Sequence, residues 1–214
     1  MAYPLTRVVR TLQATLEALY DVQCPARVEH YLIDQPEMAR DLDPLGHEVD
    51  EKLLIHEGRA DVAMCLYIAP QVVRKLEDHN PLVALSDANL GAFCSALEGV
   101  SHLTYAACNA AIDKPVTLLE MELQAEVDKF VVATLLLRRQ IKKPQHFALM
   151  RRMFGRLQLC DTLGRRDVER YAHANDAAAR FCGRVMRPHR RASQRLADLR
   201  RFYRMPKLAK LAAC

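Results

Sequence analysis

The sequence predicts a helix-dominated α+β fold, with a small three-stranded antiparallel sheet near the N-terminus followed by a bundle of about five to six helices. Two observations lead to this class. The 214 residues include only seven glycines and are rich in alanine, leucine, arginine and glutamate, which favour helices. Short β-rich runs are confined to residues 27–68, whereas apolar residues after position 70 recur at helical spacing.

The first helix and the sheet are predicted from the N-terminal part of the chain. Residues 4–20 place leucine and valine at helical spacing. Residues 27–33 divide into two alternating sets of side chains, as in a strand. Two more β-rich runs, 52–56 and 61–68, flank a polar turn around Gly58 and predict a hairpin. Because hairpin strands pair antiparallel, we expect all three strands to form one antiparallel sheet.

Prolines and capping residues divide the rest of the chain. The acidic segment 34–48 contains two prolines and is predicted to be a loop or a single helical turn. Ser86 or Asp87 is expected to cap one long helix, and Thr117 with Glu120 forms a capping box that opens another. The helices predicted after the sheet span residues 70–78, 86–112, 117–141, 145–159, 166–187 and 190–204.

The length suits one domain with its own core. We predict a single α+β domain over residues 1–187, followed by a basic C-terminal helix and tail over 188–214. Seven cysteines occur without any C-x-x-C spacing, which argues against a disulfide framework or a zinc ribbon and favours the cytoplasm. No signal peptide is recognised, and no run approaches the 18 apolar residues of a membrane-spanning helix.

A polar line runs along the helix predicted over 86–112. At about 100° per residue, Glu98, His102, Tyr105 and Asn109 fall within a sector of roughly 60°. Almost every other position is apolar or small. A helix that is apolar nearly all round is buried, so we expect this line to face the interior.

The helix predicted over 117–141 carries a matching line. Glu122, Glu126 and Lys129 lie in the middle of its apolar surface, where two carboxylates one turn apart are costly unless they are paired. The opposite side of this helix is predicted to face solvent and carries Glu120, Gln124 and Asp128.

The helix predicted over 166–187 places Tyr171 and Asn175 on its apolar face, where a buried amide needs hydrogen-bond partners. We expect the three helices to pack together around a shared polar interior. Its proposed catalytic members are Glu98, His102, Glu122 and Glu126, and its proposed ligand-binding members are Tyr105, Asn109, Lys129, Tyr171 and Asn175.

Two interpretations of this interior stay open. It can be a hydrogen-bonded network that sets the register of the helices, or a site for a ligand or a reaction. One imidazole and three carboxylates are able to hold a divalent metal. The paired Glu-x-x-His motifs of helical-bundle metal sites are missing, so the sequence alone leaves the cofactor unknown and does not favour a metal. A Glu–His pair can also act as a general base.

The C-terminal half is strongly basic. Residues 1–100 carry 8 lysines and arginines against 16 acidic residues, whereas residues 101–214 carry 23 against 10. This surplus favours an anionic partner such as nucleic acid, with a protein or lipid as alternatives. The plainer interpretation is a solvated basic helix that docks on the acidic N-terminal half. The expected contact residues are Arg190, Arg191, Arg195, Arg200, Arg201 and Arg204.

From these features we expect a non-enzymatic binding or regulatory protein of the cytosol, with a buried polar network and a basic C-terminal surface. The alternative is an enzyme, such as a metal-dependent hydrolase or oxidase, whose Glu/His site lies between the two central helices. A small-molecule sensor that uses the same interior is a third hypothesis. A homodimer that buries the apolar helix between two copies is also compatible with the sequence.

Overall fold

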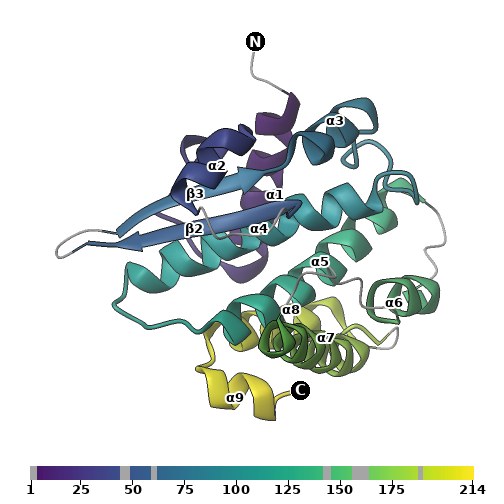
Figure 1. Cartoon of the computed structure of the whole chain (residues 1–214). Helices are drawn as coiled ribbons and strands as arrows, with labels where there is room; N and C mark the ends of the chain where they lie inside the picture. The colour runs from purple at the N-terminus through teal and green to yellow at the C-terminus, as the bar shows by residue number, and fades with distance from the viewer. Residues whose placement is uncertain (1–3, 44–48, 59–61, 142–145, 156–163, 188–189) are drawn as a thin grey trace.

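The computed structural model describes residues 4–43, 49–58, 62–141, 146–155, 164–187 and 190–214 (Figure 1). It confirms the helix-dominated α+β class, with a small sheet near the N-terminus. The helices among the described residues are α1 (Pro4–Tyr20), α2 (Pro36–Leu42), α3 (Pro70–Asp78), α4 (Leu90–Ala110), α5 (Leu118–Gln140), α6 (His146–Phe154), α7 (Arg165–Val185), α8 (Ala192–Arg204) and α9 (Lys207–Ala212).

The sheet is mixed, so the prediction of a purely antiparallel sheet is wrong. Strands β2 (Glu51–Glu57) and β3 (Val62–Ile68) form the expected antiparallel hairpin. Strand β1 (Leu32–Ile33) pairs with β3 in parallel, in the order β1-β3-β2. The chain between β1 and β3 includes α2 and β2, and a connection that long permits parallel pairing.

Three segments differ from the predicted elements. Only two residues of the strand predicted over 27–33 pair in the sheet, because Val28–His30 form a 3-10 turn, η1. The acidic segment contains helix α2, whose Pro36 stands at the first turn, where a missing N–H costs nothing. Residues 205–214, predicted as a tail, contain α9. Residues 156–159 of the helix predicted over 145–159 lie outside the described part.

The sheet, α4, α5 and α7 follow one another as layers from one end of the molecule toward the other (Figure 1). Helix α4 packs against β2, β3, α1, α3 and α5, so the chain itself buries this apolar helix. Helix α8 packs on α1, and its Leu199, Phe202 and Tyr203 belong to the same hydrophobic core. None of the helices in the described ranges is long and apolar enough to cross a membrane.

The solvent face predicted for α5 is wrong. Glu120, Gln124 and Asp128 are only 3%, 0% and 1% exposed. Tyr20 from the end of α1 hydrogen-bonds Asp128, and Lys210 from α9 hydrogen-bonds Gln124. The two ends of the chain therefore cover the side of α5 that the sequence pattern assigns to water.

Candidate functional site

A cluster of acidic side chains surrounds His102 between β2, α4 and α5. His102 Nε2 lies 3.6 Å from Glu122 Oε2, and its Nδ1 lies 4.0 Å from Glu51 Oε1. The side chains of His102 and Glu122 are 8% and 7% exposed. Glu98, His102 and Glu122 each offer one donor atom, and these three atoms lie within 4.8 Å of one another. The structure thus brings together three of the residues predicted from the sequence. We call this group, with Glu51, the Glu/His cluster.

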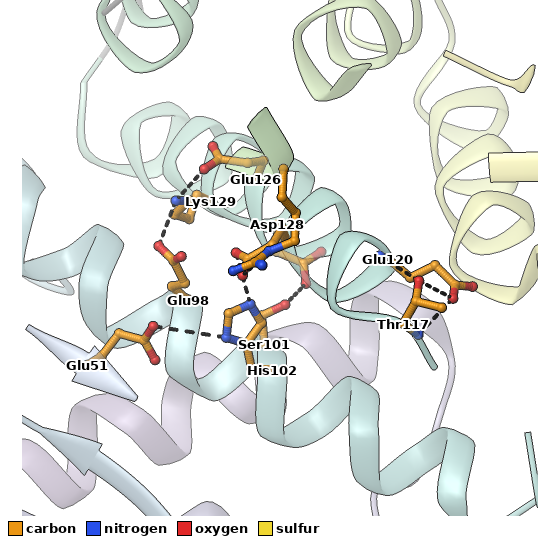
Figure 2. A network of polar contacts seen from close by, with 11 residues as sticks. Glu51, Glu98, Ser101, His102, Thr117, Glu120, Glu126, Asp128 and Lys129 are labelled. Atoms are coloured by element: carbon orange, nitrogen blue, oxygen red, sulfur yellow. Dashed lines mark hydrogen bonds and ion pairs between the residues drawn. The ribbon is translucent and has the colours of Figure 1, made fainter. Parts of the chain in front are cut away.

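Lys129 connects the Glu/His cluster to Glu126, the fourth residue that the sequence predicts at this site. Its ammonium lies 2.8 Å from Glu98 Oε2 and 2.7 Å from Glu126 Oε1 (Figure 2). Burial disfavours the charged lysine, but the two carboxylates outweigh it and hold the pKa of Lys129 well above its usual value. Burial likewise raises the pKa of Glu98, yet Lys129 and His102 lower it overall, whereas burial prevails at Glu126 and raises its pKa. One ammonium therefore serves two carboxylates.

The surroundings of His102 and Glu51 raise the pKa of both groups above neutral pH. Burial alone lowers the pKa of His102, but Glu122, Glu51 and Glu98 together raise it to about 9. Burial raises the pKa of Glu51 to about 8, although the charge of His102 lowers it. Groups with pKa values close to the working pH are the effective general acids and bases.

Glu51 reaches the cluster from β2 because Gly99 has no side chain. A Cβ atom at Gly99 would lie 2.6 Å from Leu66 Cδ1 and 2.8 Å from Glu51 Oε2, closer than real Cβ contacts. Sequence reasoning missed Glu51. Strand alternation could have found it, since Glu51 lies two positions before Leu53, which packs against the core.

Arg170 of α7 is a second group that the sequence pattern missed. Its Nε lies 3.8 Å from Glu122 Oε1, and its Nη1 lies 2.5 Å from Asp167 Oδ1. The guanidinium also lies 5.1 Å from the ring centroid of Tyr171. Burial raises the pKa of the Tyr171 hydroxyl, and the charge of Glu122 raises it further.

Three of the predicted ligand-binding residues lie outside the Glu/His cluster. Tyr105 packs edge-on against Tyr203, with ring centroids 5.1 Å apart. Asn109 donates to the Tyr105 carbonyl oxygen within its own helix. Asn175 donates to the Phe154 carbonyl oxygen and thereby ties α7 to α6. The structure gives these residues packing partners rather than a place beside His102.

A second buried polar group lies on the other side of α5, and we call it the Asp128 cluster. The Asp128 carboxylate accepts hydrogen bonds from Tyr20, Ser101 and Gln124. Lys210 donates to Gln124 Oε1 at 2.7 Å. Burial raises the pKa of Asp128 to about 6, although these donors favour its charged form. The i, i+4 spacing of Gln124 and Asp128 is the same on a solvent face as on a buried one, so the local pattern does not distinguish the two.

Most of the predicted anion-contact arginines bind the protein itself. Arg200 donates to the Leu19 carbonyl oxygen at 3.2 Å, and Arg204 donates to that of Tyr20 at 2.9 Å. Both therefore hold α8 against the C-terminal end of α1, where backbone carbonyls attract cations. Arg190 forms an ion pair with Asp198. Arg195 donates to the Arg187 carbonyl oxygen, whereas Arg191 and Arg201 are exposed.

The Glu/His cluster has the donor set of a divalent-metal site. No atom of the described residues hydrogen-bonds His102 Nε2. A metal-ligating histidine usually presents its other ring nitrogen to a carboxylate, and Glu51 stands at that position. Two carboxylates and one imidazole suit Mn²⁺, Fe²⁺ or Zn²⁺.

Comparisons of the chain with protein-family models, curated proteins and solved structures found no match in any of the three. Functional assignment therefore depends on the chemistry of the clusters described above.

Proposed function

We propose that this chain binds a divalent metal ion through Glu98, His102 and Glu122, and that the ion serves a hydrolytic reaction. The observation that carries the proposal is the convergence of three donor atoms, one each from Glu98, His102 and Glu122, which lie within 4.8 Å of one another. Carboxylate oxygens and an imidazole nitrogen are ligands that divalent ions accept.

The surroundings of these three residues support the proposal. Metal binding would release the proton of His102, so the ion would take over the positive charge that His102 supplies to Glu122 without metal. A divalent ion bound here would act as a Lewis acid and make a bound water more acidic. Glu51 lies 4.0 Å from His102 Nδ1, the ring nitrogen opposite Nε2, where it would orient the ring of a metal-bound His102.

Metal binding is tested on protein that has been stripped with EDTA. Added Mn²⁺ or Zn²⁺ is expected to raise the Tm of the wild type. When the free ion is at 100 times its Kd, the free energy of unfolding should increase by about 2.7 kcal/mol. Glu122→Gln and His102→Ala should lose this response. Elemental analysis of the purified protein would identify the ion.

Glu120→Gln is the matched control. It makes the same change on the same helix, and glutamine can also complete the capping box with Thr117. The control should keep the full metal response. A wild type that no ion stabilises, or a Glu122→Gln variant that responds like the wild type, would contradict the proposal.

The metal-free proteins separate this function from a purely structural network. If Glu122 only holds helices together, Glu122→Gln destabilises the protein even without metal. If Glu122 is a ligand, the metal-free variant keeps its stability or gains some, because a buried carboxylate has been removed.

A basic surface for an anionic partner is a second candidate function. Arg180 and Arg184 are exposed and lie one turn apart on α7, and the exposed Arg187 follows just after the end of this helix; we call these three residues the α7 stripe. This stripe supports binding to nucleic acid or to another polyanion.

The seven cysteines without paired spacing remain our reason to place the protein in the cytoplasm. A homodimer remains a prediction, which size-exclusion chromatography would check.

Point substitutions test this surface better than truncation, because Phe202 and Tyr203 of α8 lie in the core. Affinity for a mixed-sequence RNA should fall steeply with salt. The double variant Arg180→Glu with Arg187→Glu should weaken it at least tenfold, whereas Arg10→Glu on α1 should leave it nearly unchanged. Equal affinities of the wild type and the double variant would exclude the α7 stripe.

A further inference from the structure

The C-terminal helix α9 is anchored by a lysine. Lys210 is the one buried residue that the structure records within α9, and it is 0% exposed. Leu208 of the same helix is 80% exposed. An amphipathic helix normally buries its leucines and exposes its lysines. This inversion breaks a local rule, and such exceptions occur where function imposes another requirement.

Aromatic rings and one amide receive the Lys210 ammonium. Its Nζ lies 4.2 Å from the ring centroid of Tyr105, 4.9 Å from that of Phe202 and 5.9 Å from that of Tyr203. It donates one hydrogen bond to Gln124 Oε1, which belongs to the Asp128 cluster. An ammonium has three donors, and cation–π contacts only partly replace water around a charge.

The remaining contacts of the α9 segment are half-buried or exposed, and Leu211, Ala213 and Cys214 pack at the edge of the hydrophobic core. Arg184 of α7 donates to the carbonyl oxygens of Ala213 and Cys214, and its side chain is exposed. Lys114 donates to the Met205 carbonyl oxygen at 3.4 Å. Exposed polar contacts of this kind contribute little, and Lys210 is the side chain that docking of α9 removes completely from solvent.

We propose that α9 is an acid-sensitive latch, in which the uncharged Lys210 side chain docks between α4, α5 and α8 and the protonated side chain favours release. Docking then expels a proton, and acidification weakens the attachment of the C-terminus. The titratable and charged groups that face Lys210 are Tyr105, Lys114, Glu120, Asp128, Tyr203 and Cys214.

The direction of the pH dependence follows from two groups. Burial lowers the pKa of docked Lys210 to about 7, although Asp128 raises it, whereas a released lysine titrates near 10.5. Docking should therefore strengthen as pH rises above 7, by up to tenfold per pH unit. Burial raises the pKa of Asp128 to about 6, and the charge of docked Lys210 opposes this rise. Protonation of Asp128 in acid therefore removes an attraction that favours docking. Both groups make docking weaker in acid.

Amide hydrogen exchange of α9 measures the latch in the full chain. The amides of Lys210 and Ala213 bond to Pro206 and Ala209 within the helix, so their protection reports helix formation and docking. After correction for intrinsic exchange, protection in the wild type should rise between pH 7 and pH 9. Lys210→Met should stay docked with protection that does not change with pH, because methionine fits among aromatic rings and carries no charge.

Two further variants make the outcome decisive. Lys207→Met alters a lysine of the same helix that is not fully buried, and it should keep the pH dependence of the wild type. Lys210→Arg cannot lose its charge, so its α9 should exchange rapidly at every pH. The same pH slope in Lys210→Met and the wild type, or an unprotected α9 in Lys210→Met, would overturn the latch.

Discussion

Replacing Lys129 with methionine is expected to lower the free energy of unfolding by about 3–5 kcal/mol. Methionine preserves the apolar stem but leaves the carboxylates of Glu98 and Glu126 without the ammonium that lies within 2.8 Å of both. Removing one partner of a buried ion pair costs more than replacing both partners with uncharged residues, because the remaining charge has no compensation. Chemical denaturation at pH 7 gives the difference directly.

The controls for Lys129 separate charge from packing. A triple variant with Lys129→Met, Glu98→Gln and Glu126→Gln removes all three charges and should recover much of the lost stability. Lys114→Met removes a lysine that donates to a carbonyl oxygen at 3.4 Å and lies 5.9 Å from the Tyr105 ring centroid, without a carboxylate partner among the recorded ion pairs of the described residues, and it should change stability little. A loss below about 1 kcal/mol in Lys129→Met would mean that the ion pairs behave like solvated surface pairs.

Asp128→Ala is expected to be of similar severity, with a loss of about 3–5 kcal/mol. The substitution leaves Tyr20, Ser101 and Gln124 without their acceptor. Each buried donor that loses its partner costs about 1–3 kcal/mol. Because these donors come from α1, α4 and α5, the loss should appear in the global unfolding transition and not only at one helix end.

A conservative substitution and a surface control accompany the Asp128→Ala measurement. Asp128→Asn keeps the size and one acceptor oxygen, so it should lose less than Asp128→Ala. Asp176→Ala removes an exposed carboxylate on α7 and should be nearly neutral. If Asp128→Ala were as stable as Asp176→Ala, solvent rather than the Asp128 carboxylate would satisfy those donors.

The two central helices illustrate how far the sequence predicts this protein. The capping box of Thr117 and Glu120 is present with both of its hydrogen bonds, because it involves only four consecutive residues. The inward direction of Glu122 is also confirmed, since its apolar neighbours along one helix are sufficient to indicate burial. These two predictions depend on neighbours within one helix and are confirmed, whereas the cap predicted at Ser86 or Asp87 is wrong, because α4 begins at Leu90 with Asn89 as its N-cap.

The predictions that failed concern partners distant in sequence. Asp128 carries the same spacing of polar neighbours as a solvent face, yet Tyr20 lies 108 positions earlier and makes that face an interior one. Glu51 reaches His102 from a strand that no helical period can relate to α4. The antiparallel rule applied to the hairpin but not to β1, because β1 reaches β3 through a long connection.

The sequence by itself determined the helix-dominated class, the buried α4 and α5, and the placement of Glu98, His102 and Glu122 on inward faces. Periodicity and capping are local, and they act through neighbours within one or two turns. Only the tertiary structure decided that Glu51 stands behind His102, that Arg200 and Arg204 bind the end of α1, and that Lys210 is buried. A polar side chain can be satisfied equally by water or by a distant partner, and the packing of the whole chain selects between them.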